Sequence, residues 1–242
     1  SYAAASEMRA ACALLDIGVV TGFELRVSLS EAARNFPEKP AMMLTTRKLN
    51  NPDSIGIIYM TIQGIPAPAL KEVEVYLSPI RAARYRRSAL MAELANKVLF
   101  PLGLPEIDFE KDIVASSKYT EGGTITERHL LAAVARSILS EVEPGQELIK
   151  WLEEKLSLVL TGSQKRNLSE SQNPYLVYDL LGVLKAGFLD SIFIQPTEEC
   201  VDVRDAISFA NRIGGIPAYA YLGDVAESPT GDKRAEKFED EI

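Results

Sequence analysis

The sequence predicts an α/β protein in which a parallel sheet or barrel is interrupted by a helical segment. Three observations carry this expectation. Runs with the alternating pattern of strands lie toward both ends of the chain, next to runs with helical periodicity. The stretch 72–165 carries helix signals, and no convincing strand pattern is found between Leu77 and Leu160. The length of 242 residues is enough for one full-size domain with a sizeable insertion.

The first part of the chain predicts one helix and three strands. Residues 2–15 are rich in Ala, Leu and Met and have apolar positions at helical spacing, which predicts a helix that ends at Gly18. Residues 19–29 alternate like a strand. Two more strands are expected at 40–46 and 54–62, separated by an Asn-Asn-Pro-Asp turn.

The middle of the chain predicts three amphipathic helices. The first begins with Ser78 as its cap and Pro79 in its first turn. The second begins at Thr126, and the third opens at Pro144. Residues 161–174 are polar and predict a linker that leaves the helical segment.

Strand and helix alternate again toward the end of the chain. A strand is expected at 190–196, followed by a helix over 197–215 with a Thr cap and an acidic first turn. Residues 216–224 form the next expected strand, and a charged helix starts near 228. The first helix has no preceding strand and the last has no following one, so we expect the chain to be a fragment of a longer protein.

Composition narrows the possible partners. The chain has 34 acidic and 26 basic residues, a net charge of −8, which argues against binding to a nucleic-acid backbone. No apolar run reaches the ~18 to 20 residues of a membrane span. Cys12 and Cys200 lack CxxC neighbours, which favours two free thiols in a reducing, cytoplasmic setting.

Glu24 is an acidic residue inside an otherwise apolar strand pattern, where an unpaired carboxylate is costly. Alternation places Glu24 and Arg26 on the same strand face. One interpretation is a Glu–Arg pair on a solvated face. The other is a metal ligand at the end of a barrel strand.

His129 is the only histidine in the chain. It lies in the first turn of a predicted helix, directly after Arg128, and a Glu-Gly-Gly-Thr loop precedes this helix. A lone histidine is commonly a structural hydrogen-bonding residue. A glycine loop before a helix N-terminus also suits an anion, which Arg128 and His129 would then neutralise. The arginines of 81–87 are either a solvated helix face or an anion clamp.

Three stretches of the sequence resemble the PHP (polymerase and histidinol phosphatase) family. Residues 1–27 resemble the helix and strand that lead to a metal-binding Gly-x-Glu, with Glu24 as that Glu. Residues 124–138 resemble a phosphoesterase segment whose histidine matches His129. Residues 212–224 resemble a Gly-Gly…Ala-His-Pro-Gly segment, in which Tyr221 takes the place of the metal-binding histidine.

The resemblance implies an incomplete distorted (β/α)7 barrel with an all-helical insertion. The barrel would comprise 1–71 and 166–242, and the insertion 72–165. The implied activity is hydrolysis of a small phosphate ester, such as a nucleotide, by divalent zinc, manganese or iron ions.

The resemblance also implies a role for four residues. Glu24 and Tyr221 would lie on the metal side, and Arg128 and His129 on the phosphate side of the substrate. One alternative is a catalytically degenerate PHP-like domain that binds a small anion or a protein partner. Another is an unrelated α/β scaffold whose helical insertion is an interaction surface.

Overall fold

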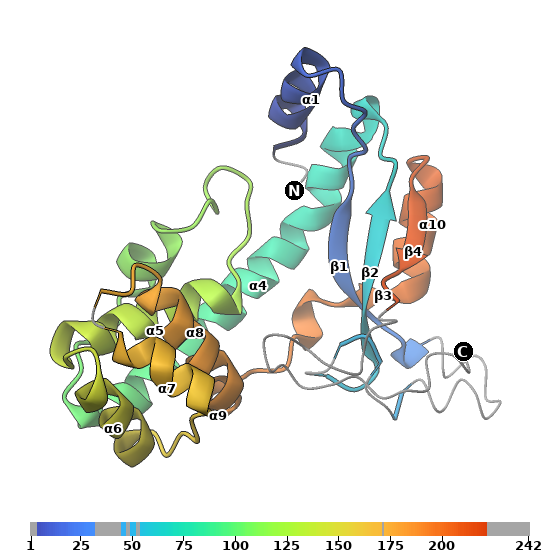
Figure 1. Cartoon of the computed structure of the whole chain (residues 1–242). Helices are drawn as coiled ribbons and strands as arrows, with labels where there is room; N and C mark the ends of the chain where they lie inside the picture. Colours follow the sequence, from blue (N-terminus) through green and yellow to red (C-terminus); the bar gives the residue numbers. More distant parts are fainter. Residues whose placement is uncertain (1–3, 32–44, 47–48, 52–53, 171, 222–242) are drawn as a thin grey trace. The chain divides into compact units, whose positions relative to one another are not determined.

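The computed structural model describes residues 4–31, 45–46, 49–51, 54–170 and 172–221. The chain has a mixed α/β fold and divides into two compact units (Figure 1). Ser1–Ala83 and Gln195–Ile242 form one, called here the sheet unit, and Arg84–Ile194 form the other, the helical unit. The expected strand 40–46 lies outside the described residues except for Thr45 and Thr46, which form a turn, and the expected helix near 228 lies outside them.

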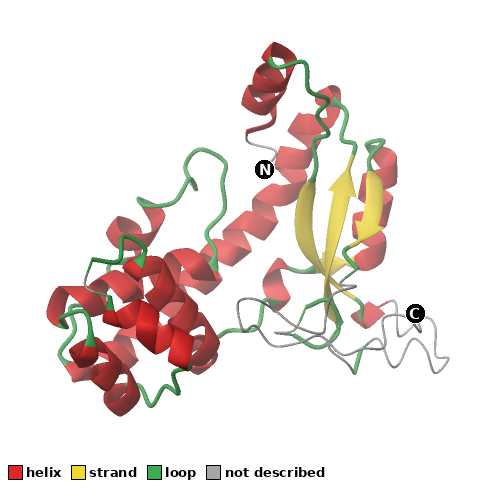
Figure 2. Ribbon diagram, in the orientation of Figure 1, coloured by secondary structure: helices red, strands yellow, loops and turns green. Residues whose placement is uncertain are grey.

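The sheet unit contains a four-stranded sheet in its described residues, drawn in yellow in Figure 2. The strand order is β3-β1-β2-β4. The strands are β1 (Phe23–Ser28), β2 (Ile57–Gln63), β3 (Val201–Asp202) and β4 (Ile216–Tyr219). The helices of this unit are α1 (Ala5–Leu14), α10 (Val203–Arg212), and the 3₁₀ turns η2 (Ala67–Ala69) and η5 (Thr197–Glu199). These described strands form an open sheet, and barrel closure is not seen among them.

The sheet is mixed, which corrects the expectation of a parallel sheet. β1 and β2 pair antiparallel with Phe23 opposite Ile62, and β2 and β4 are also antiparallel. Among the described strands, β1 and β3 alone pair in parallel. Alternation in a sequence predicts that a strand exists and which residues share a face, but it carries no information on strand direction.

One face of the sheet forms the core of its unit. Leu25 and Val27 of β1 lie on this face together with the apolar residues of β2. They pack against α10 and the first turns of α4 (Leu70–Leu99), where Phe209 and Val73 are buried. The opposite face carries the polar positions of the same strands, which is the usual arrangement when one side of an antiparallel sheet meets water.

The helical unit contains no strand in its described residues. Besides the later turns of α4 it holds α5 (Glu127–Glu141), α6 (Gln146–Lys155), α7 (Gly162–Ser169), α8 (Leu176–Gly187), α9 (Leu189–Ile192), the 3₁₀ turn η3 (Phe100–Leu102) and the π-helix η4 (Phe109–Val114). Its core is built around α5 and α8, where Leu131, Val134 and Leu184 are fully buried.

Several predicted boundaries differ from those of the structure. Pro79, expected in a first turn, lies inside α4, which begins at Leu70. The apolar positions Val73, Leu77 and Ile80 keep helical spacing across the proline and are buried in one core. Packing of this face stabilises the helix despite the missing proline N–H, an interruption that costs ~3 kcal/mol in an isolated helix.

Two segments that were expected to be a linker and a strand are partly helical. Within 161–174, α7 begins at a reciprocal cap, since the Thr161 N–H donates to Gln164 Oε1 at 2.8 Å and the Gln164 N–H donates to Thr161 Oγ1 at 3.2 Å. Residues 190–196 contain the end of α9 and a loop instead of a strand. The predicted insertion was 72–165, whereas the helical unit comprises Arg84–Ile194. It ends later because Leu168 and Leu180 belong to its core.

The helix expected over 197–215 begins later, at Val203. Its cap is Asp202, whose carboxylate accepts a hydrogen bond from the Arg204 N–H at 2.9 Å. No helix in the described part of the chain is long and apolar enough to span a bilayer.

Candidate functional site

Glu24 lies on the polar face of β1, opposite Thr61 of β2, and its side chain is exposed. This exposure explains how an acidic residue is tolerated within the strand. Across the described residues, no three His, Cys, Asp or Glu side chains are grouped so that they could hold a metal ion.

Arg26 is buried on the same strand face and forms an ion pair with Glu199, not with Glu24. The Arg26 Nη1 atom lies 2.7 Å from Glu199 Oε1. The guanidinium also donates to the Tyr59 hydroxyl at 3.2 and 3.3 Å. The interpretation of Glu24 and Arg26 as a pair on a solvated face does not hold, because β3 brings the Glu199 segment beside β1 and supplies a buried partner for Arg26.

Tyr221 follows the end of β4, and 55% of its surface is exposed. Glu24 is aligned with Thr61, and Thr61 with Ala218 of β4. Tyr221 lies beyond Tyr219, the last residue of β4, and its N–H donates to the Tyr219 carbonyl at 3.1 Å, so the chain turns there. Within the described part of the chain, no hydrogen bond or other polar interaction joins Glu24 to Tyr221.

Two polar residues, Asn50 and Ser54, form hydrogen bonds at the end of the sheet where β2 begins. The sequence patterns did not indicate them. The Asn50 side chain donates to the carbonyls of Tyr59 and Ala220, both at 2.8 Å, and accepts from the Tyr59 N–H at 2.9 Å. The Ser54 hydroxyl donates to Gln195 Oε1 at 2.8 Å. A buried amide with three backbone partners is a structural brace, and an isolated Asn in a turn-rich stretch gives no sequence signal of that role.

His129 caps the N-terminus of its own helix. Its Nδ1 atom accepts a hydrogen bond from the Thr126 N–H at 3.1 Å and lies 3.0 Å from Thr126 Oγ1. Burial lowers the pKa of the imidazole below its usual value, which favours the neutral form. A neutral Nδ1 is also what the cap requires, since a protonated nitrogen cannot accept.

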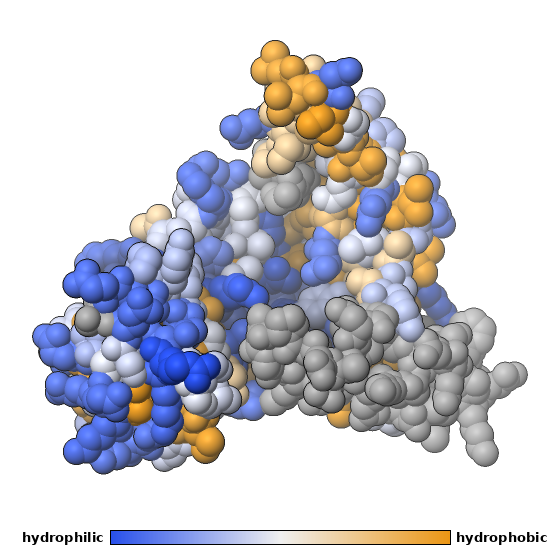
Figure 3. Space-filling view, viewed as in Figure 1, coloured by the Kyte–Doolittle hydropathy of each residue, from blue (hydrophilic) through white to orange (hydrophobic). Residues whose placement is uncertain are grey.

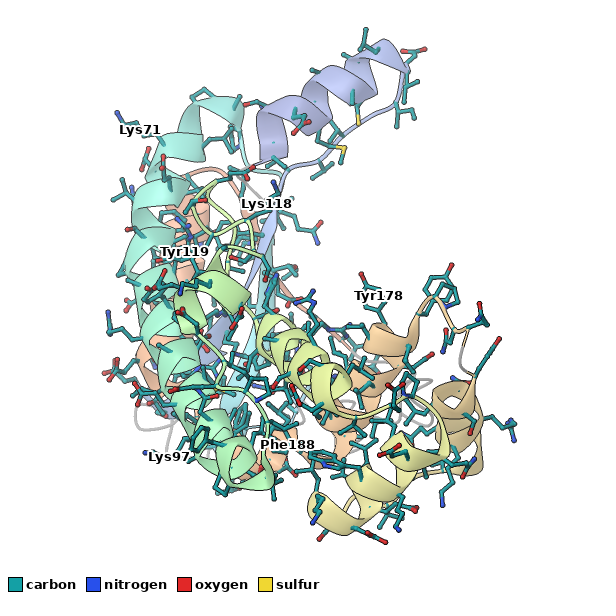
Figure 4. The ribbon with its side chains drawn as sticks, turned by 90° about the vertical axis from the view of Figure 1, so that its left-hand side faces the viewer. Lys71, Lys97, Lys118, Tyr119, Tyr178 and Phe188 are labelled. Carbon is teal, nitrogen blue, oxygen red and sulfur yellow. The ribbon has the colours of Figure 1, made fainter. Side chains whose placement is uncertain are left out.

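The Glu-Gly-Gly-Thr loop before α5 is closed by its own hydrogen bonds. The Gly122 N–H donates to the carbonyl of Tyr119 at 3.2 Å, and the Gly123 N–H to that of Lys118 at 2.7 Å (Figure 4 labels both acceptor residues). A Cβ at Gly123 would lie 2.6 Å from the Lys118 carbonyl oxygen. The glycines are thus required by a tight turn, and the two N–H groups expected to face an anion are used inside the loop.

Arginines of α4 lie at the N-terminus of α5. Arg84 Nη1 is 3.5 Å from Thr124 Oγ1. Arg87 pairs with Glu127 at 2.6 Å, donates to the carbonyl of Ile194 at 3.0 Å, and lies over the ring of Phe193. The structure therefore brings together the two basic features that the sequence indicated separately.

Arg128 follows Glu127 in the first turn of α5, and its side chain is exposed. Of the two residues expected on the phosphate side, Arg128 remains accessible and His129 serves as a cap.

These features define a mixed α/β protein in which a helical unit presents a basic helix N-terminus. Comparisons of the chain with protein-family models, with curated proteins and with solved structures gave no match.

Proposed function

We propose that the helical unit binds a small phosphorylated molecule at the N-terminus of α5. The observation that carries this proposal is the convergence of arginines from two helices. Arg84 of α4 reaches the loop that precedes α5, and Arg128 belongs to the first turn of α5 itself.

The chemistry of this position suits a phosphate. A helix of 15 residues has a partial positive charge at its N-terminus, and its first N–H groups have no partner within the helix. Guanidinium groups donate to phosphate oxygens in pairs. The negative charge of Glu127 is compensated by Arg87, which reduces the repulsion that an incoming anion would meet.

Isothermal titration of the full chain with inorganic phosphate and with adenosine 5′-monophosphate tests the proposal. Arg128→Ala should weaken binding by about tenfold, since a hydrogen bond to a charged group contributes ~1.5–3 kcal/mol. Arg136→Ala is the matched control, because Arg136 is an exposed arginine further along the same helix. Equal affinity of both variants, or no binding by the unaltered chain at millimolar ligand, would rule the site out.

A second proposal retains the PHP-like activity: metal-dependent hydrolysis of a phosphate ester in a distorted (β/α)7 barrel, with Glu24 on the side of zinc, manganese or iron and without Tyr221, which is not joined to Glu24 in the structure. The observation that supports it is the exposed side chain of Glu24 on β1. Glu24→Gln should lower bound metal and hydrolysis of p-nitrophenyl phosphate, whereas Glu74→Gln, an exposed acid on α4, should change neither. Unchanged metal content in Glu24→Gln would exclude this role.

A further inference from the structure

The helical unit contains a groove that the phosphate site does not use. It lies between α4 and the segment that leads into the π-helix η4, and it encloses about 510 Å³. Ala89 and Ala92 line it from α4, and Ile107 and Phe109 from the facing segment. Two alanines one turn apart leave space above the helix, and the volume falls in the ~300–1,000 Å³ range of small-molecule pockets.

The walls of the groove are held in place by hydrogen bonds that do not involve a ligand. The Asn96 side chain donates to the Ile107 carbonyl and accepts from the Ile107 N–H, both at 2.9 Å. Asp108 caps η4 by accepting from the N–H groups of Glu110 and Lys111, both at 3.0 Å. The groove is therefore pre-formed, which lowers the entropic cost of binding.

Phe109 is fixed in the same way. Its ring meets that of Tyr85 edge to face, with 5.1 Å between the centroids. The Tyr85 hydroxyl in turn donates to the carboxylate of Glu110. Because Tyr85 contacts the Phe109 ring, this ring gives the groove a rigid apolar wall.

The charged residues of the groove are acidic. Asp108 lines the groove, caps η4 and pairs with Lys111 Nζ at 3.4 Å. Glu93 on α4 and Glu106 on the opposite wall are exposed. Neither of these two carboxylates makes a hydrogen bond or an ion pair within the described part of the chain.

We propose that this groove binds a small aliphatic amine. The alkyl chain would lie along Ala89, Ala92 and Ile107, and ammonium groups would pair with Glu93 and Glu106. An anion would be repelled by both carboxylates, and a neutral apolar ligand would desolvate them without compensation. Carboxylates on two opposite walls favour a ligand with an ammonium group at each end, such as a diamine.

Isothermal titration of the full chain with 1,4-diaminobutane at low ionic strength tests this inference. Glu93→Gln and Glu106→Gln should each weaken binding several-fold, and the double variant by about tenfold or more. Glu143→Gln is the matched control, since this exposed acid lies between α5 and α6 and does not line the groove. 1-Butanol, which lacks the charge, should not bind.

A steric variant tests the location independently. Ala89 is half-buried on α4, so Ala89→Leu should fill the groove and abolish amine binding with little change in the melting temperature. Arg128→Ala should leave amine binding unchanged, which separates this site from the phosphate site. Amine binding that survives Ala89→Leu and both glutamine substitutions would overturn the inference. So would a lysine-containing peptide that binds at least tenfold more tightly than the diamine.

Discussion

Each of the two units contains one buried arginine–glutamate pair among its described residues, and the two pairs differ in how they are assembled. In the sheet unit, Arg26 and Glu199 lie 2.7 Å apart, with 8% and 1% of their side chains exposed. In the helical unit, Arg87 and Glu127 lie 2.6 Å apart, with 7% and 19% exposed. The partners are 173 residues apart in sequence in the first pair and 40 in the second.

The difference in sequence separation shows which parts of the chain each unit needs to complete its buried ion pair. The sheet unit joins its first strand to a segment that follows the whole helical unit, so the Arg26–Glu199 ion pair forms only when distant parts of the chain meet. The helical unit completes its pair within one continuous stretch, Arg84–Ile194. Contacts of high sequence separation cost more loop-closure entropy before they contribute, and they form more slowly.

The two units also differ in how their exposed apolar side chains are distributed. In the sheet unit, exposed apolar residues gather on α1 and the turn after it, where 87% of Leu14 and 69% of Leu15 are accessible (Figure 3). In the helical unit, the exposed apolar side chains, such as Val159 and Tyr178, come from separate segments. The helical unit therefore satisfies its own hydrophobic pattern more fully than the sheet unit does.

The largest effect is expected from breaking the pair of the sheet unit. Arg26→Ala leaves the Glu199 carboxylate buried without its counter-charge, which should lower the free energy of unfolding by about 3–5 kcal/mol. Urea unfolding followed by far-UV circular dichroism should show an earlier transition. Trp151 is the only tryptophan and packs on the core of the helical unit, so its fluorescence should report a much smaller change.

A double substitution separates the loss of the pair from the loss of one partner. Arg26→Met combined with Glu199→Leu replaces both charges by apolar groups and should recover most of the stability. An equal shift of the Trp151 transition in Arg26→Ala would show that the two units do not unfold separately.

A smaller effect is expected from the pair of the helical unit. Glu127→Gln keeps a hydrogen-bond acceptor beside Arg87, and Glu127 is partly exposed, so the loss should be about 1.5–3 kcal/mol. Here the Trp151 transition should move first. Glu141→Gln, at the exposed end of the same helix, should shift it by less than ~0.5 kcal/mol. Equal shifts in both variants would contradict a special role for the pair.

The helix and strand patterns of the sequence identified much of the fold. Residues 19–29 contain β1, the predicted strand 54–62 covers β2 except for its last residue, and Thr126 is the cap of α5 as predicted. The pattern failed where a local signal competed with packing. Ser78 and Pro79 have the form of a helix start, yet the buried Val73 and Leu77 extend the helix before them.

The short apolar run 190–196 was also ambiguous, since periodicity cannot distinguish a brief strand from a buried helical turn. For the candidate site, the sequence indicated that Arg128 and His129 share a helix N-terminus. A Thr-x-x-His spacing resembles the Thr-x-x-Glu/Gln capping box, and this signal would have predicted the capping role. The ion pairs could not be predicted, because nothing local links Arg26 to Glu199.

The smallest expected effect is that of pH on the free energy of unfolding. It should be specific to the helical unit, because His129, the only histidine of the chain, lies in α5 of that unit. Its pKa is lowered in the folded state, so the unfolded chain takes up a proton first as pH falls below about 6.5. Stability that is present above this pH should therefore decline below it, by no more than ~1 kcal/mol, the usual contribution of a cap. The cap of α10 in the sheet unit is the carboxylate of Asp202 and involves no imidazole.

The Trp151 unfolding transition measured between pH 7 and pH 5 checks this expectation. His129→Gln supplies the acceptor of a standard capping box without a titrating group, so it should retain the stability at pH 7 and remove the decline at lower pH. His129→Ala should instead lower stability at both values. A decline of the same size in His129→Gln would assign the pH dependence to carboxylates, and the imidazole would then be a cap that does not sense pH in this range.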